Sequence, residues 1–139
     1  MFDEKSCGAV VYYRKHDDFR YVVIQQRHGR HFGFPKGHME GRETEAMTAY
    51  REVREETGLD VLVIPNVKAE TTYSPRFGVK KQVVYFLAEA KSMTSERHDD
   101  EILHVLWLNE EETLKKLTHQ NNRDIFSLLV GHLKDERSL

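Results

Sequence analysis

The sequence predicts an α/β fold in which helices cover a mixed β-sheet. Short runs rich in valine, isoleucine and tyrosine recur along the chain and are separated by turn residues, as strands are. An amphipathic helical pattern interrupts these runs, and two more helical patterns follow the last of them. The 139 residues are 39% hydrophobic and 32% charged, which suits one globular domain spanning residues 1–139.

A hairpin is expected at the N-terminal end. The runs CGAVVYYR (residues 7–14) and FRYVVIQQR (19–27) flank the polar segment KHDD, so two strands joined by a turn are predicted. The next segment, HGRHFGFPKGHMEGRE (28–43), contains glycines and a proline that disfavour regular structure. We expect a long loop there, and long loops inside compact domains are often functional.

A helix is expected from Thr44 to Thr57. Gly58 follows it, in the position where a left-handed C-terminal cap is usual. One face of this helix is apolar or weakly polar, because its members recur at the spacing of helical turns. That face consists of Ala46, Ala49, Tyr50, Val53 and Thr57.

Strands and two further helices are expected in the C-terminal half. The strand-like runs cover residues 59–65, 67–73, 80–90 and 101–108. Asn109 can cap a short helix that extends through Leu117, because an asparagine side chain accepts a hydrogen bond from the first helical turn. A last helix is expected from near Asn122, and Phe126 and Trp107 are assigned to the core.

Charge and cysteine content exclude several classes of function. The formal net charge is −2 and the isoelectric point about 6.4, so no basic field favours duplex DNA or a membrane surface. Cys7 is the one cysteine, which rules out an intrachain disulfide and indicates a reducing compartment. No apolar stretch approaches the roughly 18 residues of a membrane span, and the acidic start lacks a signal-peptide core. A cytoplasmic protein is expected.

Three glutamates crowd one face of the expected helix. Glu52, Glu55 and Glu56 stand at positions i, i+3 and i+4, where like charges destabilise a helix. They also lie toward its C-terminal end, which the helix dipole makes unfavourable for anions. From the helix alone, two interpretations stay open. The face is either solvated and partly compensated by Arg51 and Arg54, or it chelates a hard divalent cation, which prefers oxygen ligands.

The segment ahead of the helix is basic. Residues 27–38 contain no acid, and an ordinary solvated loop is one explanation of that composition. A basic loop that leads into an acidic, metal-binding helix also suits a polyphosphate, since cations hold outer phosphates while metal ions bridge the reacting one. The basic or titratable residues are Arg27, His28, Arg30, His31, Lys36 and His38.

Together, the loop and the helix resemble the Nudix box, written G-x5-E-x7-R-E-U-x-E-E-x-G-U with U a bulky aliphatic residue. Every fixed position is filled at the right spacing, so the chain is identified as a member of the Nudix family. Segments outside the box are similar, in order, to the asymmetrical diadenosine tetraphosphate hydrolases, a branch of this family. The matching box positions are Gly37, Glu43, Arg51, Glu52, Val53, Glu55, Glu56, Gly58 and Leu59.

The resemblance implies a Nudix-type α/β/α sandwich with a central mixed β-sheet and a site for divalent metal. Mg²⁺, or Mn²⁺ in some members, would be held by Glu52, Glu55 and Glu56. The carbonyl oxygen of Gly37 is an additional candidate ligand.

A further metal-binding carboxylate is also implied by the resemblance. Glu101 matches the one that the tetraphosphate hydrolases use, by its place ahead of the residues WL. Asp99 and Asp100 are neighbouring alternatives.

The resemblance implies hydrolysis of a nucleoside diphosphate linked to another group, by attack of water on a phosphorus atom. The catalytic residues would be Glu52, Glu55 and Arg51. Either Glu52 or Glu55 takes the proton of the water. Arg51 orients Glu55 by a salt bridge, unless it forms an ordinary surface ion pair. Glu43 is expected to brace the loop against the helix.

Substrate contacts are expected on both sides of the box. Lys36 and His38 are candidate phosphate contacts, and Lys81 resembles a phosphate-binding lysine of the tetraphosphate hydrolases by its place before VVYF. Tyr73 is either a platform on which adenine stacks or an ordinary strand aromatic. His119 lies where some relatives carry a stacking tyrosine.

Diadenosine tetraphosphate is the expected substrate, and asymmetric cleavage would give ATP and AMP. The alternatives are an oxidised nucleoside triphosphate, ADP-ribose and the 5′ triphosphate of RNA. A module that senses a nucleotide without cleaving it is an alternative of another class. No membrane or duplex DNA partner is expected, and both a monomer and a homodimer are compatible with the sequence.

Overall fold

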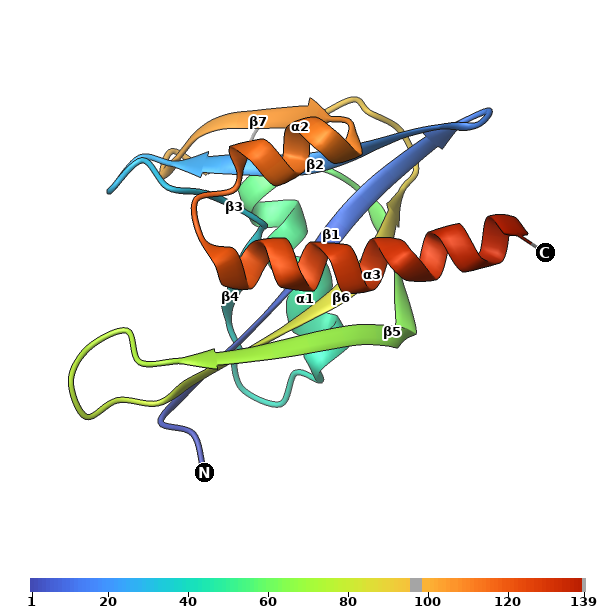
Figure 1. The fold of residues 1–139 in the computed structure, drawn as a ribbon. Helices are drawn as coiled ribbons and strands as arrows, with labels where there is room; N and C mark the ends of the chain where they lie inside the picture. Colours follow the sequence, from blue (N-terminus) through green and yellow to red (C-terminus); the bar gives the residue numbers. More distant parts are fainter. Residues whose placement is uncertain (96–98, 139) are drawn as a thin grey trace.

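A mixed β-sheet separates two layers of helices in the computed structural model, which describes residues 1–95 and 99–138. The strands are β1 (Glu4–Lys15), β2 (Asp18–Gln26), β3 (Phe32–Gly33), β4 (Lys36–His38), β5 (Val61–Tyr73), β6 (Lys81–Ala90) and β7 (Ile102–Leu108). The helices are α1 (Glu45–Thr57), α2 (Glu110–Lys116) and α3 (Gln120–Ser138). Figure 1 shows α2 and α3 on one face of the sheet and α1 on the other, which confirms the α/β/α sandwich.

Strand β1 lies at the centre of the sheet. It pairs in parallel with β6, beginning with Glu4 opposite Lys81, and antiparallel with β2, where Tyr12 lies opposite Tyr21. The order β3-β2-β1-β6-β5 places β5 at one edge, and β7 pairs with the other side of β2. The predicted N-terminal hairpin is therefore present, and the sheet is mixed as expected.

Strands β1 and β2 pair near their hairpin and then diverge, which opens the middle of the sheet. Strand β4 fills the opening on β1, where Lys36 lies opposite Gly8, and β3 fills it on β2, where Gly33 lies opposite Ile24. The prediction of an irregular loop over residues 28–43 is therefore wrong for these two short strands. The N–H and C=O groups freed by the divergence need partners, and the loop backbone supplies them.

Strand β5 is continuous where two strands were predicted. Its pairing with β6 shifts register between Ile64 and Lys68, and Pro65 lies in that irregular stretch. Proline has no N–H to donate, so it is tolerated at a bulge on an edge strand. The predicted break between residues 65 and 67 is therefore a bulge and not the end of a strand.

Helix α1 has the bounds that its caps predict. The Thr44 side chain accepts a hydrogen bond from the Met47 N–H, and Gly58 ends the helix in the left-handed region with φ 74°. The expected buried face is only partly correct, because Tyr50 is 39% exposed. Glu52, expected on the opposite face, is 8% exposed. An acid is thus buried on a helix that leaves an aromatic ring in contact with solvent.

The two C-terminal helices also begin near their predicted starts. The Asn109 side chain accepts from the Glu112 N–H while the Glu112 side chain accepts from the Asn109 N–H, which forms a capping box on α2. Helix α3 begins at Gln120, slightly before the expected Asn122, and the Asn122 N–H donates to the His119 carbonyl. Each helix in the described part of the chain is too short or too polar to span a membrane.

Two cores fill the spaces between the sheet and its helices. On the α3 side, the Phe126 ring packs edge-on against Tyr21 with ring centroids 4.9 Å apart and stacks on Phe34 at 6.0 Å. Phe126 is fully buried as expected, whereas Trp107 is only half-buried and packs edge-on against Tyr13. The core under α1 consists mainly of small and aliphatic side chains.

Cys7 provides a test of this core. Its side chain is fully buried, and burial raises the pKa of its thiol to about 11, so little thiolate forms near neutral pH. We predict that the native protein reacts with Ellman's reagent at least about 100-fold more slowly than the urea-unfolded chain. The unfolded chain should titrate one thiol per molecule. Equal rates for the native and the unfolded chain would contradict the described core.

Candidate functional site

The glutamates of α1 meet strand β4, which precedes the helix. The Glu52 carboxylate packs against the Cα of Gly37, where an added Cβ would lie 1.6 Å from Oε2. The Oε1 of Glu56 accepts a hydrogen bond from the Lys36 N–H at 3.1 Å. Both contacts require a close approach between the helix and the strand. A side chain at position 37 would therefore force the Glu52 carboxylate to move.

Negative charge at this contact is only partly compensated. Burial raises the pKa of Glu52 to about 7, an effect that Arg51 opposes and Glu55 increases. Burial also raises the pKa of Glu56 to about 8, and the charges of Glu52 and Asp99 add to this shift. A cation placed among these groups would stabilise their ionised forms.

Arg51 connects the helix to the loop. Its Nε donates to Glu43 Oε2 at 2.6 Å, and its Nη2 donates to the His38 carbonyl at 2.9 Å. The expected salt bridge to Glu55 is present at 3.2 Å. The Arg51 guanidinium lowers the pKa of Glu43 to about 2. Glu43 also accepts a hydrogen bond from the Thr48 hydroxyl at 2.9 Å, so it holds the loop against the helix as expected.

The ligand types at this contact fit a hard divalent cation. Glu52, Glu55 and Glu56 supply carboxylate oxygens, which Mg²⁺ prefers. Among residues 1–95 and 99–138, no three His, Cys, Asp or Glu side chains are gathered closely enough to hold a metal ion. Each glutamate is instead near a local donor, which is the Lys36 N–H for Glu56 and the Arg51 guanidinium for the other two. A cation would compete with these donors for the carboxylate oxygens.

A further carboxylate approaches from the segment before β7. The Asp99 N–H donates to the Glu55 carbonyl at 3.0 Å, which holds this segment against the end of α1. Glu101 is exposed, and its bonds to Arg27 and Asp99 are made by its backbone. The charge of Asp99 acts on Glu56, while the choice of Glu101 as the additional metal-binding acid stays a prediction.

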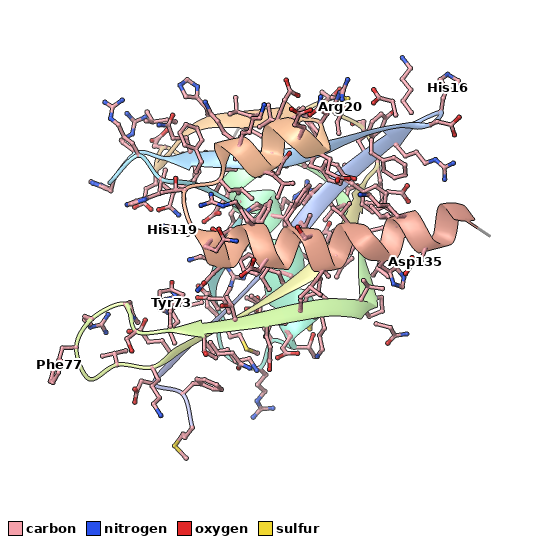
Figure 2. The ribbon with its side chains drawn as sticks, in the orientation of Figure 1. His16, Arg20, Tyr73, Phe77, His119 and Asp135 are labelled. Atoms are coloured by element: carbon pink, nitrogen blue, oxygen red, sulfur yellow. The ribbon has the colours of Figure 1, made fainter. Side chains whose placement is uncertain are left out.

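A cavity of about 430 Å³ lies between the sheet and the start of α3. Three of the predicted substrate-binding residues line it, namely Lys36, Tyr73 and His119. Figure 2 shows Tyr73 at the end of β5 and His119 at the start of α3 on the same side of the molecule, whereas Phe77 projects away on the loop after β5. The cavity thus combines flat rings with a cationic side chain.

Two lysines lie where the cavity approaches the glutamates. Lys81 is 8% exposed and lies opposite Tyr73 in the sheet. Burial, and next the charge of Lys81, lower the pKa of Lys36, while the charge of Glu56 opposes the shift. The charges of Lys81 and Glu56 thus act on the Lys36 ammonium in opposite directions. His38, the remaining candidate for a phosphate contact, is exposed at the end of β4.

The sequence did not reveal all of the cavity wall. His119 stacks on His31, with ring centroids 4.9 Å apart. Beside them, the Phe32 N–H donates to the Thr118 hydroxyl at 2.8 Å and the Thr118 N–H donates to the Phe32 carbonyl at 3.1 Å. Tyr85 of β6 also lines the cavity, and burial raises its pKa. Strand alternation could have identified Tyr85, but the histidine stack joins segments that are far apart in sequence.

The chain matches a known protein family and several of its members. A family model described as NUDIX domain matches residues 4–129. The chain is 34% identical over 119 residues to the Mus musculus bis(5′-nucleosyl)-tetraphosphatase (asymmetrical), covering 78% of this chain and 80% of the mouse protein. It is 31% identical over 97 residues to the Sus scrofa protein of the same name, covering 63% of this chain and 65% of that protein.

Solved structures share the fold. A binary complex of the C. elegans Ap4A hydrolase superposes with a TM-score of 0.86 at 21% identity, covering 95% of this chain and 98% of that one. The NUDIX domain of Shewanella oneidensis NrtR, complexed with ADP ribose, has a TM-score of 0.75 at 13% identity, covering 94% and 88% of the two chains.

Gly37 provides a test of the contact between β4 and α1. An alanine there would place a methyl group on the Glu52 carboxylate, so Gly37→Ala should lower the free energy of unfolding by about 1–3 kcal/mol. Gly131→Ala is the matched control, because nothing lies within 4 Å of an added Cβ at that helical position. Alanine should be neutral there or stabilise the protein by up to about 1 kcal/mol. Urea unfolding monitored by circular dichroism measures both variants.

The cause of the Gly37→Ala effect can be isolated. In a Glu52→Ala background the carboxylate is absent, so the added methyl group should cost clearly less than in the wild type. A cost that is the same in both backgrounds would show that the carboxylate is not what excludes a side chain at Gly37.

Proposed function

Because the chain belongs to the Nudix hydrolase family, we propose that it hydrolyses diadenosine tetraphosphate asymmetrically, giving ATP and AMP. The names of the mouse and pig relatives support this substrate. The complete box and the cavity beside it provide the parts that such a reaction needs. These parts are aromatic rings on which a nucleobase can stack, lysines for the phosphate chain, and carboxylates that can hold a metal ion and accept a proton.

The observation that carries the proposal is that the cavity and the glutamates meet at one residue. The Lys36 side chain lines the cavity, while the Lys36 N–H binds Glu56 on α1. A nucleoside bound between Tyr73 and His119 would therefore extend its phosphates past Lys36 and Lys81 toward the glutamates. Charge-assisted hydrogen bonds from lysine to phosphate are among the strongest in proteins.

Binding one end of a symmetric molecule is compatible with asymmetric cleavage. A cavity of about 430 Å³ suits a single nucleoside, so the second adenosine of the substrate would remain outside it. The glutamates lie at a fixed position relative to that cavity, because Lys36 belongs to both. The attacked phosphorus is therefore set by its distance along the chain from the bound nucleoside, which breaks the symmetry of the substrate.

The residues of the box have three different roles in the proposed reaction, which are metal binding, proton transfer and positioning. Glu52, Glu55 and Glu56 would hold the divalent cation, for which we propose Mg²⁺, with Mn²⁺ as a substitute. When bound, such a cation would neutralise phosphate charge and make water a better nucleophile. Either Glu52 or Glu55 accepts the proton of the attacking water. Arg51 keeps Glu55 in place by the salt bridge at 3.2 Å.

A substrate panel tests the proposal. The protein is incubated with Mg²⁺, and separately with Mn²⁺, together with diadenosine tetraphosphate, ADP-ribose, an oxidised deoxynucleoside triphosphate or triphosphorylated RNA, and the products are identified. ATP plus AMP from the first compound, with the highest kcat/KM of the panel, is the expected result. Two ADP from that compound, a higher kcat/KM for another compound, or no turnover of any of them would contradict the proposal.

Glu56→Gln tests the assignment of a metal ligand. Glutamine retains an oxygen for the Lys36 N–H but loses the charge, so the fold should persist while kcat falls at least about 100-fold. Mg²⁺ should raise the melting temperature of the wild type, and the variant should lose about half of that gain or more. Glu111→Gln, which removes the same charge from an exposed pair with Lys115 on α2, is the control. Wild-type turnover by Glu56→Gln would show that the ligand is misassigned.

A further inference from the structure

Tyr85 forms part of the cavity floor beside Lys36. Its side chain is 1% exposed, and its ring packs edge-on against Phe34. In the sheet, Gly8 of β1 lies opposite Tyr85 on one side and Lys36 on the other. Residues that lie opposite one another in a sheet point to the same face, so the Tyr85 and Lys36 side chains share the cavity face with only a glycine between them. Tyr85 therefore lines the same cavity as the lysine past which the proposed function extends the phosphates.

A hydrogen bond from α3 limits how this hydroxyl can be oriented. Asn122 also lines the cavity, and its Nδ2 donates to the Tyr85 oxygen at 3.4 Å. The Asn122 Oδ1 faces Gly33 instead. A Cβ atom added to that glycine would lie 3.3 Å from this oxygen. The Asn122 N–H, which bonds the His119 carbonyl, fixes the residue in the first turn of the helix.

The direction of that bond determines what Tyr85 can offer to a ligand. A phenolic hydroxyl has one hydrogen to donate and can also accept. When its oxygen accepts from the amide of Asn122, its own hydrogen must point away from Asn122. Because both residues line the cavity, the hydrogen is then available to an acceptor in the cavity.

We propose that Asn122 is a positioning residue for the phosphate chain: by donating to Tyr85, it keeps the Tyr85 hydroxyl turned toward a phosphate oxygen of the bound nucleotide. This inference rests on the proposed function, which places the phosphates beside Lys36. The ionised oxygens of a polyphosphate accept hydrogen bonds and do not donate them. A hydroxyl turned the other way would present its lone pairs to these oxygens and would repel them.

Asn122→Asp reverses the bond with little change of shape. A carboxylate only accepts, so it takes the Tyr85 hydrogen and leaves the tyrosine lone pairs facing the cavity. Binding of ATP and of adenosine is measured without added metal, by calorimetry and by NMR titration. ATP binding should weaken by about 10- to 100-fold, whereas adenosine, which has no phosphate, should change by less than about 3-fold. Ser127→Asp adds the same charge to an exposed residue of α3 that does not line the cavity, and it should weaken ATP binding by no more than about 3-fold.

A double-mutant cycle assigns the effect to the tyrosine hydroxyl. Tyr85→Phe should itself weaken ATP binding, and adding Asn122→Asp to it should cost no more than Ser127→Asp does, since no hydroxyl remains to be turned. Asn122→Ala leaves the hydroxyl undirected and should weaken ATP binding by about 3- to 10-fold while adenosine binding is retained. This neutral variant decides the question if the charged one does not fold.

Two results would overturn the inference. One is an equal loss of ATP and adenosine affinity in the Asn122 variants, which would mean that the residue only shapes the cavity. The other is full additivity between Asn122→Asp and Tyr85→Phe. Both results come from binding measurements, so they bear on Asn122 even if the wild-type protein does not cleave diadenosine tetraphosphate. Absence of diadenosine tetraphosphate cleavage by the wild-type protein would count against the proposed function and not against the role of Asn122.

Discussion

The arrangement of the site depends on the Arg51 guanidinium. It binds Glu43 in the loop, the His38 carbonyl on β4 and Glu55 on its own helix. A planar group with several donors in fixed directions can serve all three partners, which the single ammonium of a lysine could not do in the same geometry. Because the loop carries β4 to the surface of α1, this contact determines where the strand and the remaining glutamates meet.

Strand β4 joins two clusters that appear separate in the sequence. Successive side chains of an extended strand point to opposite faces. Gly37 therefore faces α1, where its missing side chain leaves room for the Glu52 carboxylate, while Lys36 faces the cavity. The Lys36 N–H meanwhile binds Glu56. Two adjacent residues thus connect a cavity that contains a lysine side chain with an acidic helix, although the two lie on different faces of the sheet.

Local signals predicted α1 well and the sheet less completely. The caps at Thr44 and Gly58 act within a few residues of the helix ends, so the sequence alone defines its bounds. Strands β3 and β4 form because β1 and β2 diverge, and no local pattern reports that divergence. The same limit applies to the site. The box pointed to the glutamates, but the effect of the Asp99 charge on Glu56 depends on how the segment before β7 meets the end of the helix.

Helix α1 departs from ordinary amphipathic packing at the residues that the proposed chemistry needs. Glu52 is 8% exposed while Tyr50, assigned to the buried face by its spacing, is 39% exposed. Burying an acid costs free energy unless it is paired, and the Arg51 guanidinium at 3.4 Å from Oε1 offsets only part of that cost. An apolar side chain at this position would pack against β4 without the penalty. The chain instead places an acid there and a glycine opposite it, so two residues give up stability to keep one carboxylate at the contact. Such paired departures from local rules are expected where function sets the residue.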